Sequence, residues 1–191
     1  PATDLDWEET RKPYRFDAAV YSRRVYQGFG KPLPEEPLRL GPNITDWPRM
    51  APLAENLLLK VASVIRDPVT TTDELIPSGE TSSLRSNPLK LAEFALSRKD
   101  PDYVARAKAA QSLEAQRQAF LAGEGTAEGL RQALPSFITQ ASPAEEFRRW
   151  LSETALGSVL FAVKPGDGSA REQAASCQKV LGGQANLARE Y

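Results

Sequence analysis

The stretch SVLFAVKPGDGSAREQAASCQKVLGG, residues 158–183, decides the predicted fold. Residues 158–163 form a short apolar run with β-branched members, which is typical of a buried strand. Residues 164–169 form a Gly-rich loop, and residues 170–181 are rich in helix formers and stop at two glycines. Another apolar stretch begins at Ala185. A strand, a loop, a helix and a second strand predict the α/β class.

The chain upstream adds one more predicted strand and several helices. Residues 57–65, LLLKVASVI, are mostly apolar with β-branched residues at the end, which predicts a buried strand. Residues 66–88 are rich in Thr, Ser, Pro and Gly and are expected to form loops. Helices are predicted to begin at Pro88, to run from Asp100-Pro101 to about Leu121, and to cover residues 143–151 with Ser142 as the N-cap.

Residues 1–40 differ in composition from the remainder, residues 41–191, which we expect to form one domain. The first segment holds Pro13, Pro32, Pro34 and Pro37, runs of charge, and six aromatic side chains, too many for a solvated linker. We expect an N-terminal arm or interdomain linker that lies extended on a partner surface, with a short helix within Asp17–Tyr26. Because the chain begins at Pro1, we also expect a piece of a longer polypeptide.

The residue counts exclude several kinds of chemistry within this chain. It has 191 residues, no His and one Cys. Histidine-dependent nucleophile pairs, His-containing zinc sites and an internal disulfide are therefore excluded. The formal net charge of −1 gives no electrostatic sign of nucleic-acid binding. With no apolar run of about 18 residues and no apolar leader at the start, we expect a cytoplasmic protein that does not bind membranes.

The loop from Gly166 to Arg171 is the strongest local candidate for a site. Its glycines allow backbone N–H groups to approach a ligand, and the helix that follows favours an anion at its N-terminus. A cation is unfavourable there, so Arg171 needs a reason such as a carboxylate or phosphate ligand. The alternative is structural: Ser169 caps the helix, and Arg171 pairs with Asp167.

Two further features have a structural and a functional interpretation. The second loop holds Asp73, Ser78, Ser82, Ser83 and Arg85, and such clusters mostly form turns. Cys177 lies midway along the last predicted helix. It is more often a small buried apolar residue than a nucleophile or a metal ligand in such a position.

Four segments together resemble the aconitase-type hydro-lyases. Residues 166–175, GDGSAREQAA, are similar to the family's G-x-G-S-S-R-E-H-A-A run, and residues 69–79, VTTTDELIPSG, to its T-T-D-H-I-x-P-A-G segment. Residues 84–87, LRSN, with a Glu-Phe pair downstream, match L-R-S-N…E-Y, and residues 41–44 match G-P-N-I. The resemblance covers residues 41–191 and is to the C-terminal swivel domain, found separately as the small subunit of isopropylmalate dehydratases. The family domain continues beyond the point that matches Tyr191, so we expect truncation at that end too.

The resemblance implies a swivelling β/β/α fold and an iron–sulfur-dependent reaction. The family adds or removes water on a hydroxy-di- or tricarboxylate, with a 4Fe–4S cluster as Lewis acid. By matched position, Ser169 would be the catalytic base, and Arg171 and Arg85 would clamp substrate carboxylates. Gly166, Gly168 and Asp73 would support the loop. The cluster's cysteines have no match here, so the cluster would be bound by domains absent from this chain, and those domains would be its partners.

Three departures from the family pattern affect the expected substrate. Ala170, at a substrate-binding position, replaces the second Ser of the family run, so one hydrogen bond to substrate is expected to be missing. Gln173 and Glu74 stand where the family pattern has His. These departures argue against aconitase itself. They also support an alternative, a non-catalytic anion-binding or regulatory module that kept the swivel fold.

Overall fold

The computed structural model describes residues 4, 15–22, 30–139 and 143–191. The chain forms two units, Pro1–Arg39 and Leu40–Tyr191. In the first, the helix expected within Asp17–Tyr26 is the four-residue α2, Ala19–Ser22, and the Asp17 carboxylate accepts a hydrogen bond from the Ala19 N–H at 2.9 Å. The end of the predicted helix, including Tyr26, lies outside the described residues.

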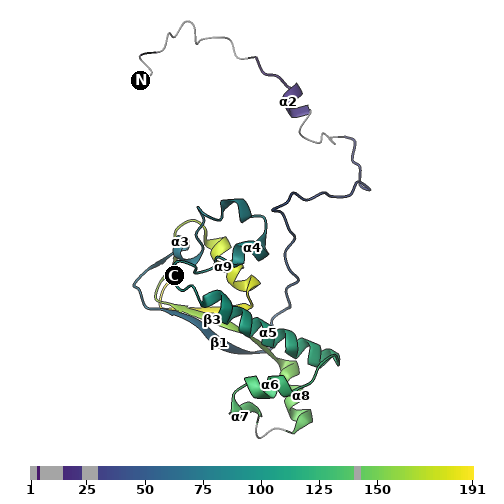
Figure 1. The fold of residues 1–191 in the computed structure, drawn as a ribbon, viewed down its shortest axis with the longest axis vertical. Helices are drawn as coiled ribbons and strands as arrows, with labels where there is room; N and C mark the ends of the chain where they lie inside the picture. The colour runs from purple at the N-terminus through teal and green to yellow at the C-terminus, as the bar shows by residue number, and fades with distance from the viewer. Residues whose placement is uncertain (1–3, 5–14, 23–29, 140–142) are drawn as a thin grey trace. The chain divides into compact units, whose positions relative to one another are not determined.

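The second unit is α/β with parallel sheets, as the sequence predicted (Figure 1). Its main sheet has the strand order β1-β3-β5, and both pairs are parallel. The strands are β1 (Asn56–Ile65), β3 (Thr154–Ala162) and β5 (Gly183–Ala188). Parallel neighbours need long crossover connections, and helices α5 (Tyr103–Ala122) and α9 (Arg171–Val180) lie in those connections.

The helices of this unit mostly begin where sequence signals place them. The Asn87 side chain caps α4 by accepting from the Lys90 N–H at 3.0 Å, and Gly123, with φ of 85°, ends α5. Three short helices, α3, α6 and α7, were not predicted, and α3 lies within residues 66–88, which were expected to form loops. The N-cap of α8 is Pro143, not the predicted Ser142, which lies outside the described residues. The helices are α3 (Thr72–Leu75), α4 (Pro88–Ala92), α5 (Tyr103–Ala122), α6 (Glu128–Ala133), α7 (Ser136–Thr139), α8 (Ala144–Glu153) and α9 (Arg171–Val180).

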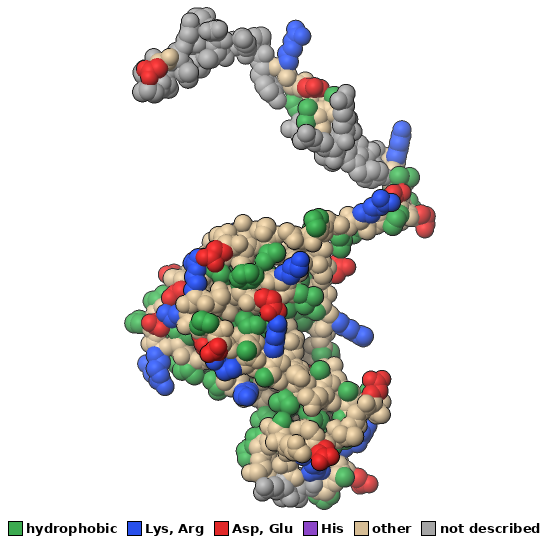
Figure 2. Space-filling view, viewed as in Figure 1, with side chains coloured by type: hydrophobic (Ala, Val, Ile, Leu, Met, Phe, Trp, Pro, Cys, Tyr) green, Lys and Arg blue, Asp and Glu red, His purple; other side chains and the backbone are tan. Residues whose placement is uncertain are grey.

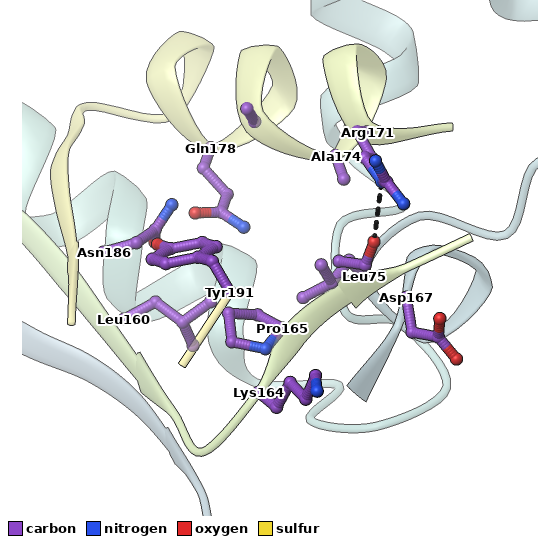
Figure 3. A pocket seen from close by; sticks show the side chains of 12 residues that line it. Leu75, Leu160, Lys164, Pro165, Asp167, Arg171, Ala174, Gln178, Asn186 and Tyr191 are labelled. Carbon is purple, nitrogen blue, oxygen red and sulfur yellow. Dashed lines mark hydrogen bonds between the residues drawn. The ribbon is translucent and has the colours of Figure 1, made fainter. Parts of the chain in front are cut away.

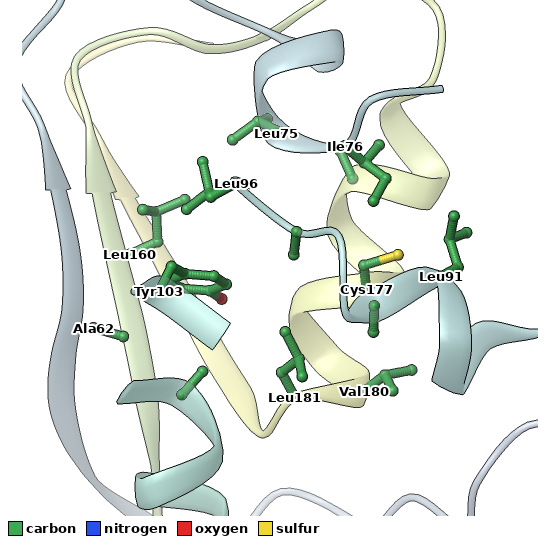
Figure 4. Packing of buried hydrophobic residues seen from close by; sticks show 14 of the residues in the cluster. Ala62, Leu75, Ile76, Leu91, Leu96, Tyr103, Leu160, Cys177, Val180 and Leu181 are labelled. Atoms are coloured by element: carbon green, nitrogen blue, oxygen red, sulfur yellow. The ribbon is translucent and has the colours of Figure 1, made fainter. Parts of the chain in front are cut away.

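The main core lies between the sheet and helices α4, α5 and α9 (Figure 4). Tyr103 of α5, Leu160 of β3 and Cys177 of α9 are each at most 2% exposed. A second cluster contains Leu130, Phe147, Leu151 and Leu156 and joins α6 and α8 to the start of β3. The prediction that Cys177 is a buried apolar residue is confirmed.

The predicted strands are present, but β1 is only half-buried. Val61 and Val64 are 54% and 48% exposed, which corrects the prediction of a buried strand. They pair in register with Val159 and Phe161 of the central strand β3. The exposure is on the outer strand, because Val159 of β3 is only 5% exposed. Parallel sheets usually have both faces covered.

Charges are interspersed on the face of this unit that Figure 2 shows. Basic and acidic side chains alternate there, in keeping with the net charge of −1. Among the described residues, no helix has the length and apolar character needed to cross a bilayer.

Candidate functional site

The pairing of β2 (Thr70–Thr71) with β4 (Pro165–Asp167) organises the candidate site. The two short strands are parallel, and the Thr70 N–H donates to the Lys164 carbonyl at 2.9 Å. Part of the predicted loop 164–169 is therefore a strand. The register shifts at Gly166, which has φ of 92°, a backbone conformation that favours glycine. The pairing joins two segments that are far apart in the sequence.

Gly168 follows this strand and packs directly on α3. Its φ is 135°, and a Cβ built on it would lie 2.2 Å from the Thr72 Oγ1. A side chain does not fit at this position, so the loop before α9 can approach α3 only because residue 168 is glycine.

Helix α3 begins with a capping box that the sequence reasoning missed. The Thr71 hydroxyl accepts from the Glu74 N–H at 3.2 Å, and the Glu74 carboxylate accepts from the Thr71 N–H at 2.8 Å. Lys99 forms ion pairs at 3.0 Å with both Glu74 and Asp67. The backbone hydrogen bond from Thr71, and then Lys99, lower the pKa of Glu74. The T-x-x-E spacing of residues 71–74 was the available signal.

Asp73, predicted to support the site, holds its own loop together. Its carboxylate accepts from the Ser78 N–H at 3.2 Å and pairs with Arg98. Arg98 also pairs with Glu80. Asp73 therefore stabilises the turn that follows α3, which agrees with the structural interpretation of this Ser-rich loop.

The start of α9 differs from the structural alternative drawn from the sequence. The N-cap is Ala170, no side chain caps the helix, and Ser169 lies exposed just before it. Within the described residues, Arg171 has no ion pair with Asp167. Its Nε instead donates to the Gly166 carbonyl at 3.1 Å. The helix N-terminus, Ser169 and the end of the Arg171 guanidinium are thus left available to a ligand or a partner.

Arg85, the second predicted clamp, is exposed and directly follows the 3₁₀-helix η2 (Ser82–Leu84). The loop around it is anchored by Thr45, whose N–H donates to the Ser86 carbonyl at 2.9 Å. The Asn87 side chain donates to the Thr45 hydroxyl at 3.1 Å. These bonds connect the segment at residues 41–45 with residues 84–87.

A pocket of about 490 Å³ lies beside the loop (Figure 3). Of the predicted site residues, Gly166 and Arg171 line it, whereas Ser169, Gly168, Ala170, Asp73 and Arg85 do not. Its other lining side chains include Lys164, Gln178 and Asn186, none of which was predicted. The sequence did hold a signal that Gln178 faces inward: it lies four residues after Ala174, on the same buried face of α9.

The described residues do not fit an iron–sulfur cluster. No group of three potential ligands from His, Cys, Asp and Glu gathers among them. Burial, and then the charge of Glu172, raise the pKa of Cys177 to about 12, whereas cluster ligation needs thiolates.

Comparisons with protein-family models, curated proteins and solved structures gave no match to this chain. The observations that bear on its function are therefore its own residues and the way the fold arranges them.

Proposed function

We propose that residues 41–191 are the swivelling domain of an iron–sulfur-dependent hydro-lyase acting on hydroxy-di- or tricarboxylates. In this proposal Ser169 removes a proton from substrate carbon, while Arg171 and Arg85 bind carboxylates. The cluster and the rest of the catalytic site belong to other domains. The observation that carries the proposal is the β2–β4 pairing, which joins two of the segments that resemble this family.

The surroundings of Ser169 support a role for its hydroxyl as a base. A serine hydroxyl is a poor base near neutral pH unless N–H donors and cations stabilise its alkoxide. Ser169 directly precedes the ten-residue helix α9, and no side chain caps that helix. The first-turn N–H groups and Arg171 are donors of the required kind.

The exposure of the three proposed residues suits a site completed by another domain. Ser169, Arg171 and Arg85 are all exposed. Closure against a second domain would exclude water and strengthen their interactions with a bound anion. Glu74, which replaces a family His, is already used by the cap of α3 and by Lys99, so this position would contribute differently to substrate recognition here.

The test uses the full-length protein with its cluster reconstituted and follows the dehydration of citrate and isopropylmalate. We expect Ser169→Ala to lower kcat about 10²–10⁴-fold, the usual contribution of a general base. Arg171→Lys should raise KM because lysine lacks the planar bidentate fork. Ser152→Ala, an exposed serine on α8, is the matched control. Turnover by Ser169→Ala close to the wild-type rate would contradict the assignment.

One observation favours the alternative of a non-catalytic anion-binding module. Within the described residues, the Ser169 side chain makes no hydrogen bond to a basic group. Calorimetry with citrate, isopropylmalate and phosphate on the full-length, cluster-loaded protein separates the two functions. Binding without turnover would identify the module, whereas turnover that depends on Ser169 would identify the enzyme.

A further inference from the structure

The pocket beside the loop contains the side-chain amide of the largely buried residue Gln178. Gln178 of α9 is 6% exposed, and its side chain points into the pocket (Figure 3). Within the described residues, its amide makes no hydrogen bond. The Gln178 amide is not among the fully buried polar atoms without a partner, so it is accessible from the pocket, and it can offer both a donor and an acceptor to a ligand.

A second amide lies at the same end of the pocket. Asn186 comes from β5, which packs next to α9, and its side chain lines the pocket near Gln178 (Figure 3). Two amides offer both donors and acceptors, so this end matches a carbonyl, a hydroxyl or an amide of a ligand.

The opposite end of the pocket carries both charges, since Arg171 and the Asp167 carboxylate line it without forming an ion pair. Arg171 lies there (Figure 3), and among the described residues no carboxylate pairs with it. Its Nε is used by the Gly166 carbonyl, so its two terminal nitrogens remain available. These two nitrogens can together bind one carboxylate through two hydrogen bonds.

Apolar side chains form much of the pocket wall. Leu75, Leu160 and Ala174 line it and are each at most 4% exposed. A volume of about 490 Å³ lies within the range of small-molecule sites, which combine apolar walls with a few placed polar groups.

We propose that this pocket binds a small organic acid whose carboxylate meets Arg171, whose apolar body lies on Leu75 and Leu160, and whose carbonyl, hydroxyl or amide meets Gln178 and Asn186. This site goes beyond the proposed hydro-lyase function, because it requires neither Ser169 nor Arg85. A ligand here would compete for Arg171 with a substrate bound beside Ser169. The decisive variants are therefore at Gln178 and Asn186.

N-acetyl-L-leucine is the probe, since it carries a carboxylate, an isobutyl group and an amide. Titrated into the full-length ¹⁵N-labelled protein, it should shift the side-chain amide signals of Gln178 and Asn186 in a saturable way. N-acetyl-L-leucinamide, which lacks the carboxylate, should bind at least tenfold more weakly. The absence of a saturable shift up to about 10 mM, or equal binding of the two probes, would overturn the proposal.

Variants separate binding from folding. Gln178→Leu should weaken binding of N-acetyl-L-leucine at least tenfold without lowering the urea midpoint, because within the described residues the amide makes no hydrogen bond that the change would remove. Gln173→Leu, on the same helix but outside the pocket, should leave binding unchanged. Asn186→Ala, at an exposed position on an edge strand, should weaken binding severalfold without changing the midpoint.

Three results with these variants would count against the site. If Gln178→Leu lowers the urea midpoint or fails to fold, the amide has a structural partner. If Gln178→Leu binds the probe as well as wild type does, the amide does not contact the ligand. If Ser169→Ala abolishes probe binding, the site is not separate from the one in the proposed function.

Discussion

The Thr72 hydroxyl occupies the space that a side chain at Gly168 would need, with only 2.2 Å between its oxygen and a Cβ built on the glycine. Because residue 168 has no side chain, the loop that carries Ser169 can lie against the first residue of α3. The geometry of the candidate site therefore depends on a residue that carries no side chain.

Gly168→Ala should destabilise the chain more than Gly166→Ala. Both glycines have positive φ, but a Cβ at Gly166 would meet no atom within 4 Å. Gly166→Ala should cost about 1–2 kcal/mol of unfolding free energy for backbone strain alone, and Gly168→Ala about 1–3 kcal/mol more for overpacking. Urea denaturation of the two variants measures the difference.

The double variant Thr72→Ala/Gly168→Ala provides the control for this clash. Removing the Thr72 Oγ1 and methyl relieves the closest contacts, so the double variant should be less destabilised than the sum of its single changes. Additive losses would show that Thr72 does not limit residue 168.

Glu74→Gln should reduce stability at neutral pH but not in acid. The pKa of Glu74 is lowered below its ordinary value of 4.5 by Thr71 and Lys99. The stabilisation by its charge is therefore fully present above the unfolded-state pKa, and it is lost as pH falls through the lower folded-state pKa. Urea midpoints measured from about pH 7 down to about pH 3 should converge for wild type and variant.

Glutamine keeps the acceptor for the Thr71 N–H, so this variant isolates the charge from the cap. Glu124→Gln, at an exposed glutamate without an ion pair among the described residues, is the control. Its urea midpoint should stay close to that of wild type over the same pH range. A Glu74→Gln deficit that persists undiminished in acid would mean that the carboxylate charge is not the cause.

Arg117→Met should be strongly destabilising. Arg117 and Glu114 form an ion pair at 2.7 Å whose side chains are only 10% and 14% exposed. Arg117 also donates to the Leu151 carbonyl at 2.6 Å, and Glu114 accepts from the Leu156 N–H at 2.7 Å. Removing one partner of a buried pair costs about 3–5 kcal/mol. Thermal and urea unfolding measure the loss.

An exposed ion pair between another residue of α5 and the end of α4 serves as the comparison. Lys108 pairs with Glu93, and both side chains are about half exposed, so Lys108→Met should cost less than about 1 kcal/mol. Equal losses for Lys108→Met and Arg117→Met would refute the importance of burial for the Arg117 pair.

Cys177 should resist alkylation in the folded chain. Burial is the main cause that raises its pKa to about 12, and the residue is 1% exposed, so almost no accessible thiolate exists near neutral pH. We expect iodoacetamide to react orders of magnitude faster in denaturant than in buffer, as followed by mass spectrometry. Comparable rates in the two solutions would contradict the described core.

The sequence predicted the α/β class and most of the long elements because their signals are local. Apolar runs with β-branched residues marked β1 and β3, and helix formers that end at glycines marked α9. The same signals did not predict which side chains are buried. The sequence of β1 is typical of a buried strand, yet Val61 and Val64 are exposed. Burial depends on what packs against each face, and a run of residue types does not contain that information.

For the candidate site, too, the sequence predicted the residue types, and the tertiary structure decided their contacts. The sequence predicted a candidate site at residues 166–171 because glycine, serine and arginine each have chemical properties that suggest anion binding. Only the tertiary structure paired β2 with β4 and bound Arg171 to the Gly166 carbonyl instead of Asp167. It also directed the Gln178 amide into a pocket, where it makes no hydrogen bond within the described residues. These outcomes depend on contacts between distant segments. Sequence by itself determined which groups are available, and packing decided which of them are already used.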